Sequence, residues 1–357
     1  MDSKQFLYEY LNAYSPVAQE HEGQKIWSDY VSEYVDSMHS DTYGTSYGIL
    51  HSDVETTGSG VVPKVAIEAH CDEISWMISY IDSDGYVYVV RHGGSDQQIA
   101  PSKTVVVHTR KNGRIRGVFG WPAIHVRKDK SDNPSLDNIF VDFGASSKEE
   151  IAEMGIEVGN IITFDDQLWE MGDYYVGKAL DNKIGGYIIA EVVRRIKEQN
   201  IKLPFDLYVV NSVQEEVGLY GARMIANRIK PDVALVTDVC HITKSPMYNV
   251  KKDAETIGGK GCAIEHTAQN HRQLLELFRE CGDENDIKYQ LTIGSYGNDT
   301  MGFFLADGGI PTAIIATPLK YMHTTVEMAH KDDVESVIKM YIESLKNLTN
   351  KTTLLNK

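Results

Sequence analysis

Two patterns of apolar positions divide the chain. In its first and last parts, β-branched runs such as 65–70 and 204–212 alternate with amphipathic helical stretches such as 188–199 and 335–348. Strands that alternate with helices of this length are typical of α/β domains. The pattern therefore predicts an α/β fold, in which residues 1–72 and 167–357 together form a mixed-sheet, three-layer α/β/α domain.

The middle of the chain, residues 73–166, has a different composition. Short β-rich pieces, separated by Gly, Asn and Asp turns, lie at 76–81, 86–92, 104–109, 114–120, 138–144 and 160–165. One helical stretch interrupts them, with a capping pattern at Ser146 and Glu149 and a glycine stop at Gly155. Closely spaced short strands favour a small β-barrel or sandwich domain, inserted into the α/β domain.

The N-terminal residues predict a surface helix. Apolar side chains recur at helical spacing at Phe6, Leu7, Tyr10 and Leu11, and Ser15-Pro16 ends the pattern. The start lacks a basic segment followed by an apolar run, and no apolar stretch approaches the roughly 18 residues of a membrane span. We therefore expect neither a secretory leader nor a transmembrane segment.

Ligand-type side chains follow or interrupt apolar segments at five places. They are His70, Asp181, the pair Glu215-Glu216, Asp238 and His323. In open α/β sheets, side chains beyond the carboxyl ends of the strands share one crevice. Any one of these residues alone is more often a solvated loop residue or a cap. Together they predict a metal site with a proton-transferring carboxylate.

The residue types suit this chemistry. Imidazole and carboxylate groups bind zinc, cobalt or manganese, and one aspartate can give an oxygen to each of two ions. Asp181 is the bridging candidate, because we expect it to open the helix that continues through 184–196. On extended backbone Glu215 and Glu216 face opposite ways, so one can bind metal while the other acts as a base. Asp72 is placed to accept the second ring N–H of His70.

Several sequence motifs around these residues resemble those of a known family. The stretches AHCDEI, HGGSDQQI, GKALDNKIGG, QEEVGLYGA and YMHTTVE follow one another in that family's order. On these motifs the chain resembles the tetrahedral (TET-type) dinuclear metallo-aminopeptidases, which include glutamyl, leucyl and lysyl aminopeptidases and members once named cellulase or endoglucanase M. The resemblance implies that one metal is held by His70, Asp181 and Asp238, and the other by Asp181, Glu216 and His323. It also implies Glu215 as general base and Asp72 as the partner of His70.

The resemblance further implies two divalent ions per subunit, with zinc expected first and cobalt or manganese as alternatives. It implies peptide substrates, dimerisation through the inserted domain, and a homododecamer built from dimers. Two places depart from the family pattern. Asn298 and Thr300 replace the Thr and Ala of a common Gly-Thr-Asp-Ala motif, and Lys183 replaces a common Arg. These stretches lie near the substrate in the family, so the preferred N-terminal residue stays open.

Charge and cysteine content restrict the partners and the compartment. The formal net charge is −16 over 357 residues. Nucleic acids and anionic membranes require cationic surfaces, so neither is an expected partner. The cysteines at 71, 240, 262 and 281 form no close pair, which suits a reducing cytoplasm, and we expect them to be buried apolar filler.

The predicted reaction is removal of the N-terminal residue of a peptide. Two metals lower the pKa of a water, and Glu215 takes its proton and returns it to the leaving amine. The same core could serve an N-acyl amino-acid deacylase or a carboxypeptidase, and a non-catalytic scaffold could keep the fold. Sugar hydrolysis would need two carboxylates across a cleft without metal. Among the other histidines, His92 and His125 fit structural roles, and His241 either lines the substrate pocket or lies at the surface.

Overall fold

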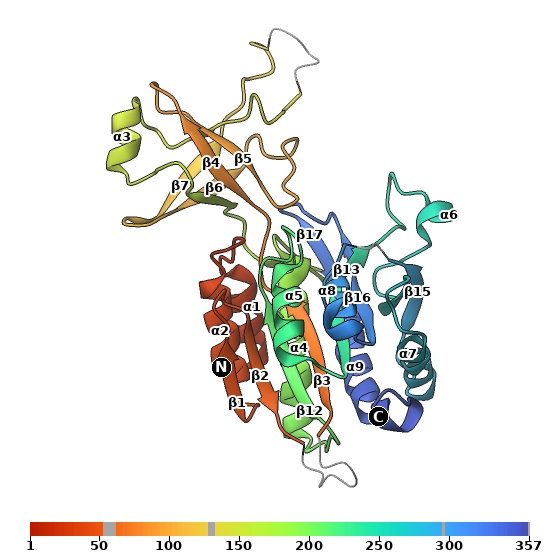
Figure 1. Ribbon diagram of the computed structural model, residues 1–357. Coiled ribbons are helices and arrows are strands. Elements are labelled where there is room, and N and C mark those ends of the chain that lie inside the picture. The colour runs from red at the N-terminus through yellow and green to blue at the C-terminus, as the bar shows by residue number, and fades with distance from the viewer. Residues whose placement is uncertain (53–61, 128–132, 295–296, 356–357) are drawn as a thin grey trace.

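The computed structural model of the chain describes residues 1–52, 62–127, 133–294 and 297–355. Figure 1 shows a large α/β body that contains both termini and a smaller β body, in orange and yellow, that projects from one end of it. The chain leaves the large body after β3 and returns to it at β10. The smaller body is therefore an insertion within the larger one.

The elements have the following bounds. The helices are α1 (Ser3–Asn12), α2 (His21–Val31), α3 (Lys148–Glu153), α4 (Leu180–Glu198), α5 (Tyr220–Ile229), α6 (Val250–Asp253), α7 (Arg272–Glu284), α8 (Thr300–Phe304), the 3-10 helix η1 (Ala306–Gly308) and α9 (Lys331–Lys351). The strands of the large body are β1 (Ser37–Ser40), β2 (Ser46–Leu50), β3 (Lys64–His70), β10 (Trp169–Met171), β11 (Tyr174–Gly177), β12 (Asp206–Ser212), β13 (Val233–His241), β14 (Cys262–His266), β15 (Tyr289–Ile293), β16 (Thr312–Lys320) and β17 (Glu327–His330). The strands of the smaller body are β4 (Ser75–Ile81), β5 (Val87–His92), β6 (Thr104–Thr109), β7 (Gly113–Phe119), β8 (Val141–Asp142) and β9 (Ile161–Phe164).

The large body is built on one mixed sheet, to which the described chain contributes 11 strands. The order along its main path is β1-β2-β12-β3-β13-β16-β17-β11-β10, and β14 and β15 extend it from β16. The central strands β12, β3, β13 and β16 are parallel to one another, whereas the strands at both ends of this path pair antiparallel. A parallel strand that is covered on both faces needs apolar residues at nearly every position. This explains the unbroken apolar runs in β3 and β13.

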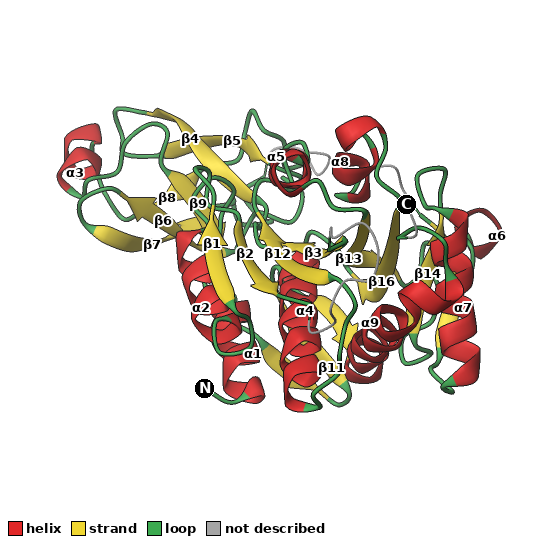
Figure 2. Ribbon diagram, turned by 60° about the horizontal axis from the view of Figure 1, so that its bottom comes forward, coloured by secondary structure: helices red, strands yellow, loops and turns green. Residues whose placement is uncertain are grey.

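Helices cover both faces of the sheet (Figure 2). One face carries α1, α2, α4, α7 and α9, and the other carries α5 and α8. Successive side chains of β3 enter different layers, because Val65 packs in the larger core and Ala66 in the smaller core with Ile225 and Phe303. The predicted N-terminal helix is confirmed as α1, which buries all four apolar residues expected on its inner face.

The smaller body is a closed antiparallel barrel with the strand order β4-β5-β8-β7-β6-β9. Its core packs the Trp76 ring edge-on against Phe119, with 5.4 Å between ring centroids. The helix α3 begins one residue later than expected, because Ser147 accepts the N–H of Glu150 and the Glu150 carboxylate accepts the N–H of Ser146. The predicted fold class is thus confirmed, with a barrel rather than a sandwich, while the domain boundaries at 72 and 167 stay predictions.

Within the described ranges, no helix combines the length and the apolar character that crossing a bilayer requires.

Candidate active site

Two of the expected ligands are carried by neighbouring parallel strands. His70 is the last residue of β3 and lies opposite Ser212, the last residue of β12. Asp238 lies in β13, two residues beyond Val236, which pairs with Glu68 of β3. Because parallel strands advance together, Asp238 lies level with His70 at the carboxyl end of the sheet, where the chain enters the barrel.

The other expected ligands lie on loops or at the start of a helix, and two details of their backbone differ from the prediction. Glu215 and Glu216 lie in the loop between β12 and α5, and the residue before them has a φ of +58°. Their side-chain directions therefore do not follow from a pleated strand. Asp181 lies in the first turn of α4 but has non-helical backbone angles, and Oδ1 of Asn182 accepts the N–H of Gly185. Asp181 thus lies at the start of the helix as expected, but the regular helical turns begin after it.

Asp181 lies between the two imidazoles. Its Oδ1 is 3.3 Å from Nε2 of His70, and its Oδ2 is 3.2 Å from Nε2 of His323. The same His323 atom is 3.3 Å from Oε1 of Glu216. Nε2 of His70 is 3.8 Å from Oε2 of Glu215 and 3.9 Å from Oδ1 of Asp238. The structure therefore brings the five expected ligands and the expected base into one cluster.

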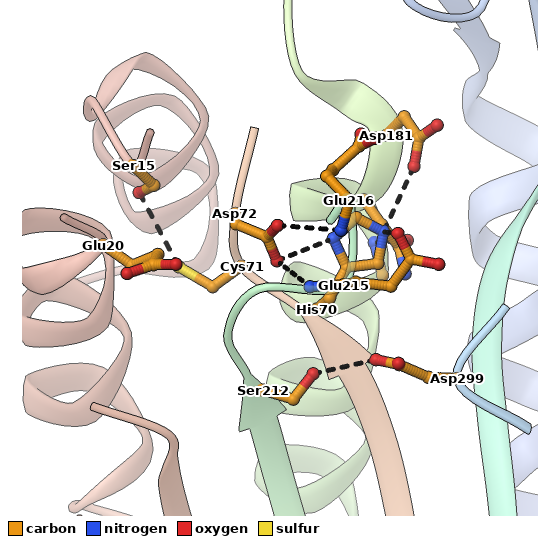
Figure 3. Close-up of polar contacts among 12 residues, drawn as sticks. Ser15, Glu20, His70, Cys71, Asp72, Asp181, Ser212, Glu215, Glu216 and Asp299 are labelled. Carbon is orange, nitrogen blue, oxygen red and sulfur yellow. Dashed lines mark hydrogen bonds and ion pairs between the residues drawn. The ribbon is translucent and has the colours of Figure 1, made fainter. Parts of the chain in front are cut away.

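Asp72 holds the loop that carries the glutamate pair. Its two carboxylate oxygens accept the backbone N–H groups of Glu215 at 3.0 Å and Glu216 at 3.1 Å (Figure 3). Its Oδ1 also lies 3.4 Å from Nδ1 of His70, but this contact lacks the alignment of a hydrogen bond. The sequence indicated the contact with His70 but not the two backbone contacts.

Glu327 holds backbone N–H groups on the other side of the cluster, as Asp72 does on the first side. The sequence did not indicate this residue. Its Oε2 accepts the N–H of Asp181 at 3.1 Å, and its Oε1 accepts the N–H of His323 at 2.7 Å. The side chain is buried in β17, four residues after His323. Two buried carboxylates, Asp72 and Glu327, thus fix the backbone of four site residues.

A further buried acidic pair lies behind His70. The hydroxyl of Ser212 donates to Glu68 at 2.6 Å. It also lies 2.9 Å from Oδ2 of Asp299 (Figure 3). Burial raises the pKa of Glu68, and the neighbouring Asp299 raises it further. One of these two carboxyl groups therefore retains its proton more readily than an exposed one. Sequence reasoning did not select either residue.

Carboxyl groups crowd the buried cluster. Burial raises the pKa values of Glu215, Glu216 and Asp238, and repulsion between the carboxylates adds to this effect. Burial has the same effect on Asp181, but the two imidazoles outweigh it and lower the pKa. Burial opposes the charge of His323, yet Asp181 and Glu216 raise its pKa to about 11. Two imidazolium groups can balance this negative charge only in part.

The donor set fits two divalent cations. The donor atoms fall into two groups, His70 with Glu215 and Asp238, and Asp181 with Glu216 and His323, and those of each group lie within 4.8 Å of one another. Oε1 of Glu216 is buried without a hydrogen bond in the part of the chain that the structure describes. Carboxylate and imidazole are suitable ligands for zinc, cobalt or manganese. Asp181, with one oxygen toward each imidazole, has the arrangement of a bridging ligand.

The cluster opens into a cavity of about 800 Å³ that is large enough for an amino-acid side chain. Gly94, from the loop after the barrel strand β5, lines it, so the barrel body forms part of its wall. His241 lines it as well, and its Nδ1 lies 3.3 Å from the hydroxyl of Tyr248. His92 of β5 contacts Ser75 of the neighbouring barrel strand β4, and His125 is exposed; neither residue lines the cavity.

Known proteins resemble the chain over most of its length. The model of the M42 glutamyl aminopeptidase family matches residues 54–340. The lysyl aminopeptidase of Pyrococcus furiosus is 33% identical over 79% of this chain and 81% of its own. The structure of a TET aminopeptidase from the marine sediment archaeon Thaumarchaeota archaeon SCGC AB-539-E09 has a TM-score of 0.90 at 28% identity, covering 97% of this chain and 96% of its own. The Pyrococcus horikoshii TET1 peptidase, which can assemble into a tetrahedron or a large octahedral shell, has a TM-score of 0.82 at 26% identity, covering 96% and 98%.

Proposed function

The chain belongs to the M42 glutamyl aminopeptidase family, and we propose that the cluster described above is its catalytic centre. It is a peptide hydrolase of the aminopeptidase type. One observation carries the proposal, namely that Asp181 lies between His70 and His323 with one carboxylate oxygen toward each imidazole. Such a carboxylate can serve two metal ions at once.

The proposed metal ligands follow from this arrangement. His70, Asp181 and Asp238 would hold one divalent ion, and Asp181, Glu216 and His323 the other. Zinc is the first candidate, and cobalt or manganese suits the same donors. When bound, the ions would polarise the carbonyl of the first peptide bond and make a water acidic enough to lose a proton near neutral pH.

Glu215 is the proposed general base. Its Oε2 lies 3.8 Å from Nε2 of His70, and its side chain lines the cavity at the cluster. Burial raises its pKa, so its carboxylate accepts a proton more readily than an exposed glutamate does. Because Asp72 holds its backbone N–H, the base is fixed beside the two ligand groups, where it would meet the attacking water. It would take a proton from that water and give it to the leaving amine.

The substrate would enter with its free amino group first. With two divalent ions bound, the charge of the four cluster carboxylates would be balanced, and a free α-amino group could bind at the inner end of the cavity as a neutral nitrogen donor. An N-acylated substrate has no such amine to offer. The family match, rather than charge, supports an aminopeptidase over a carboxypeptidase.

A panel of amino-acyl reporter substrates tests the proposal. After treatment with a chelator and reloading with zinc, cobalt or manganese, we expect free-amino reporters to be cleaved and their N-acetylated forms to resist. We expect Glu215→Gln to lower kcat about 100- to 10,000-fold while both metal ions stay bound. Glu276→Gln, on the exposed side of α7, is the matched control and should keep normal turnover. Full turnover by the Glu215→Gln protein, or equal cleavage of N-acetylated reporters, would refute the assignment.

We further propose that the barrel, within residues 73–166, carries a dimer contact and that dimers build a dodecamer. Apolar side chains exposed on this body, including Tyr80, Val90, Val118 and Ile124, support the contact. The tetrahedral assembly of the Pyrococcus horikoshii relative supports the higher order. Light scattering should give the mass of twelve chains, and a monomer at micromolar concentration would exclude the assembly. A cytoplasmic location also belongs to the proposal, because the four cysteines are buried free thiols.

A further inference from the structure

One carboxylate in the cavity lies outside the proposed metal cluster and is buried. Glu265 lies near the end of β14, and only 4% of its surface is exposed. Ile264, the residue before it, points into the main core, so Glu265 points to the opposite face of the sheet, which lines the cavity. Ala263, two residues earlier, packs on that face against Cys240 and Ala316.

The surroundings of Glu265 leave room for its carboxylate but give it no partner. A side-chain carbon at Gly294 would lie 2.0 Å from Oε2 of Glu265, so the glycine leaves the space that the carboxylate occupies. Thr292 lies opposite Glu265 in the parallel pairing of β14 with β15 and lines the cavity too. Among the residues that the structure describes, none forms a hydrogen bond or an ion pair with this carboxylate.

Burial raises the pKa of Glu265 to about 7, and no charged neighbour adds to this shift. A buried carboxylate without a partner destabilises the free protein. A cation that enters the cavity would supply the missing partner.

Outside the cluster, the other carboxylate and the guanidinium group of the cavity wall differ from Glu265 in burial or in having a partner. Asp253, in α6, is half-buried and accepts the N–H of Asn249. Arg223, in α5, is exposed and forms no ion pair with Glu265 in the described part of the chain. Two divalent ions would occupy the carboxylates of the cluster, which leaves Glu265 as the buried charge that can discriminate between substrates.

We propose that Glu265 selects substrates whose N-terminal residue has a cationic side chain, lysine or arginine. This inference rests on the proposed aminopeptidase function, in which the cluster binds the α-amino group and the cavity binds the side chain of the same residue. Glu265 would contact the ammonium or guanidinium group of that side chain. It would act on specificity and take no part in the proton transfers assigned to Glu215.

The test compares lysyl with norleucyl reporters, because norleucine keeps the aliphatic chain of lysine without its ammonium group. We expect the metal-loaded enzyme to prefer the lysyl reporter in kcat/KM. Glu265→Gln should lower kcat/KM for the lysyl reporter about 10- to 100-fold, the range for loss of one charged hydrogen bond, and leave the norleucyl value unchanged. Glu265→Asp should keep part of the preference. Asp253→Asn, which neutralises the half-buried cavity carboxylate outside the cluster, is the matched control and should keep all of the preference.

A binding measurement separates this inference from the proposed function. Titration calorimetry should show tighter binding of free L-lysine than of L-norleucine to the wild-type protein, and equal binding to the Glu265→Gln protein. If no reporter is cleaved but this binding difference appears, the proposed function fails and the role of Glu265 stands. The inference would be overturned if Glu265→Gln lost lysyl and norleucyl turnover equally. It would also be overturned if the wild-type enzyme preferred the norleucyl reporter, or if Asp253→Asn lost the lysyl preference.

Discussion

Replacing Glu73 with glutamine tests whether a buried ionic network holds the chain segments around the site in place. Glu73 lies between β3 and β4 and is only 3% exposed. Its carboxylate accepts the N–H of Ser15 at 2.8 Å and contacts the ammonium groups of Lys178 and Lys183. Lys183 also donates to the backbone oxygen of Ala13. The network thus connects the segment after α1, the segment after β3, and the start of α4.

The pKa of Glu73 gives the magnitude. Burial favours its neutral form, but Lys178 and Lys183 outweigh this effect and hold the pKa at about 2, compared with a usual value of 4.5. At about 1.4 kcal/mol per pKa unit, this depression corresponds to about 3 kcal/mol of folding free energy. Because the pKa is lower in the folded state, this stability is present above pH 4.5 and is lost as the pH falls toward 2.

The substitution removes the counter-ion of two buried cations. Breaking a buried ion pair in this way costs about 3–5 kcal/mol. Burial lowers the pKa of Lys178, so this lysine can release its proton when the carboxylate is gone, which keeps the cost near the lower limit. We therefore expect Glu73→Gln to reduce the free energy of unfolding at pH 7 by about 3 kcal/mol.

Urea unfolding, followed by circular dichroism in the presence of a chelator, measures this effect. At pH 7 the midpoint of the Glu73→Gln unfolding curve should lie at a lower urea concentration than that of the wild type. At pH 4 the difference between their free energies of unfolding should be about 1 kcal/mol smaller than at pH 7, because Glu73 of the wild type has lost part of its stabilising effect. Glu170→Gln removes a surface carboxylate that pairs with Lys331, and this control should leave the curve nearly unchanged. Equal stability of Glu73→Gln and wild type at pH 7 would show that the network does not stabilise the fold.

Two predictions concern the cluster itself. Asp72→Asn keeps one acceptor for the N–H groups of Glu215 and Glu216 but loses the negative charge. We therefore expect kcat to fall about 10- to 100-fold and metal binding to weaken. Unchanged kinetics in a metal titration would contradict the role of Asp72. His323→Ala removes an imidazole from one ligand group and leaves His70 in the other, so calorimetry should show the loss of one of two metal-binding events. Retention of both events, or loss of both, would count against the two-group assignment.

The sequence predicted those site residues whose positions depend on strand ends and on ligand chemistry. His70 and Asp238 lie on buried parallel strands, and such strands give long apolar runs that are visible in the sequence. Parallel strands bring their carboxyl ends together, so the convergence of these two residues followed from the fold class.

Other features depend on contacts between distant segments or on local backbone angles, which the pattern does not contain. Glu327 holds the N–H of Asp181, 146 residues away in the chain, and no spacing rule indicates such a contact. The start of α3 lies one residue after the predicted start, because two overlapping sequences match a capping box: Ser146 with Glu149, and Ser147 with Glu150. Only the contacts of the folded chain select the second. Asp181 is predicted to open its helix, and it lies in the first turn of α4, but its non-helical backbone angles cannot be read from composition. Glu265 resembles a solvated acid at a strand end until the opposing glycine is seen.

The connection between the sheet and the barrel has an evolutionary consequence. The outgoing segment at Glu73 and the returning segment at Lys178 are joined by an ion pair, although about a hundred residues separate them. Changes in barrel segments remote from the cavity are therefore confined between these two fixed points and leave the spacing of His70 and Asp181 intact, whereas the loop with Gly94 borders the cavity and is restricted by it. In such an architecture, the outer surface of the barrel can diverge between relatives while the hydrolytic chemistry is retained.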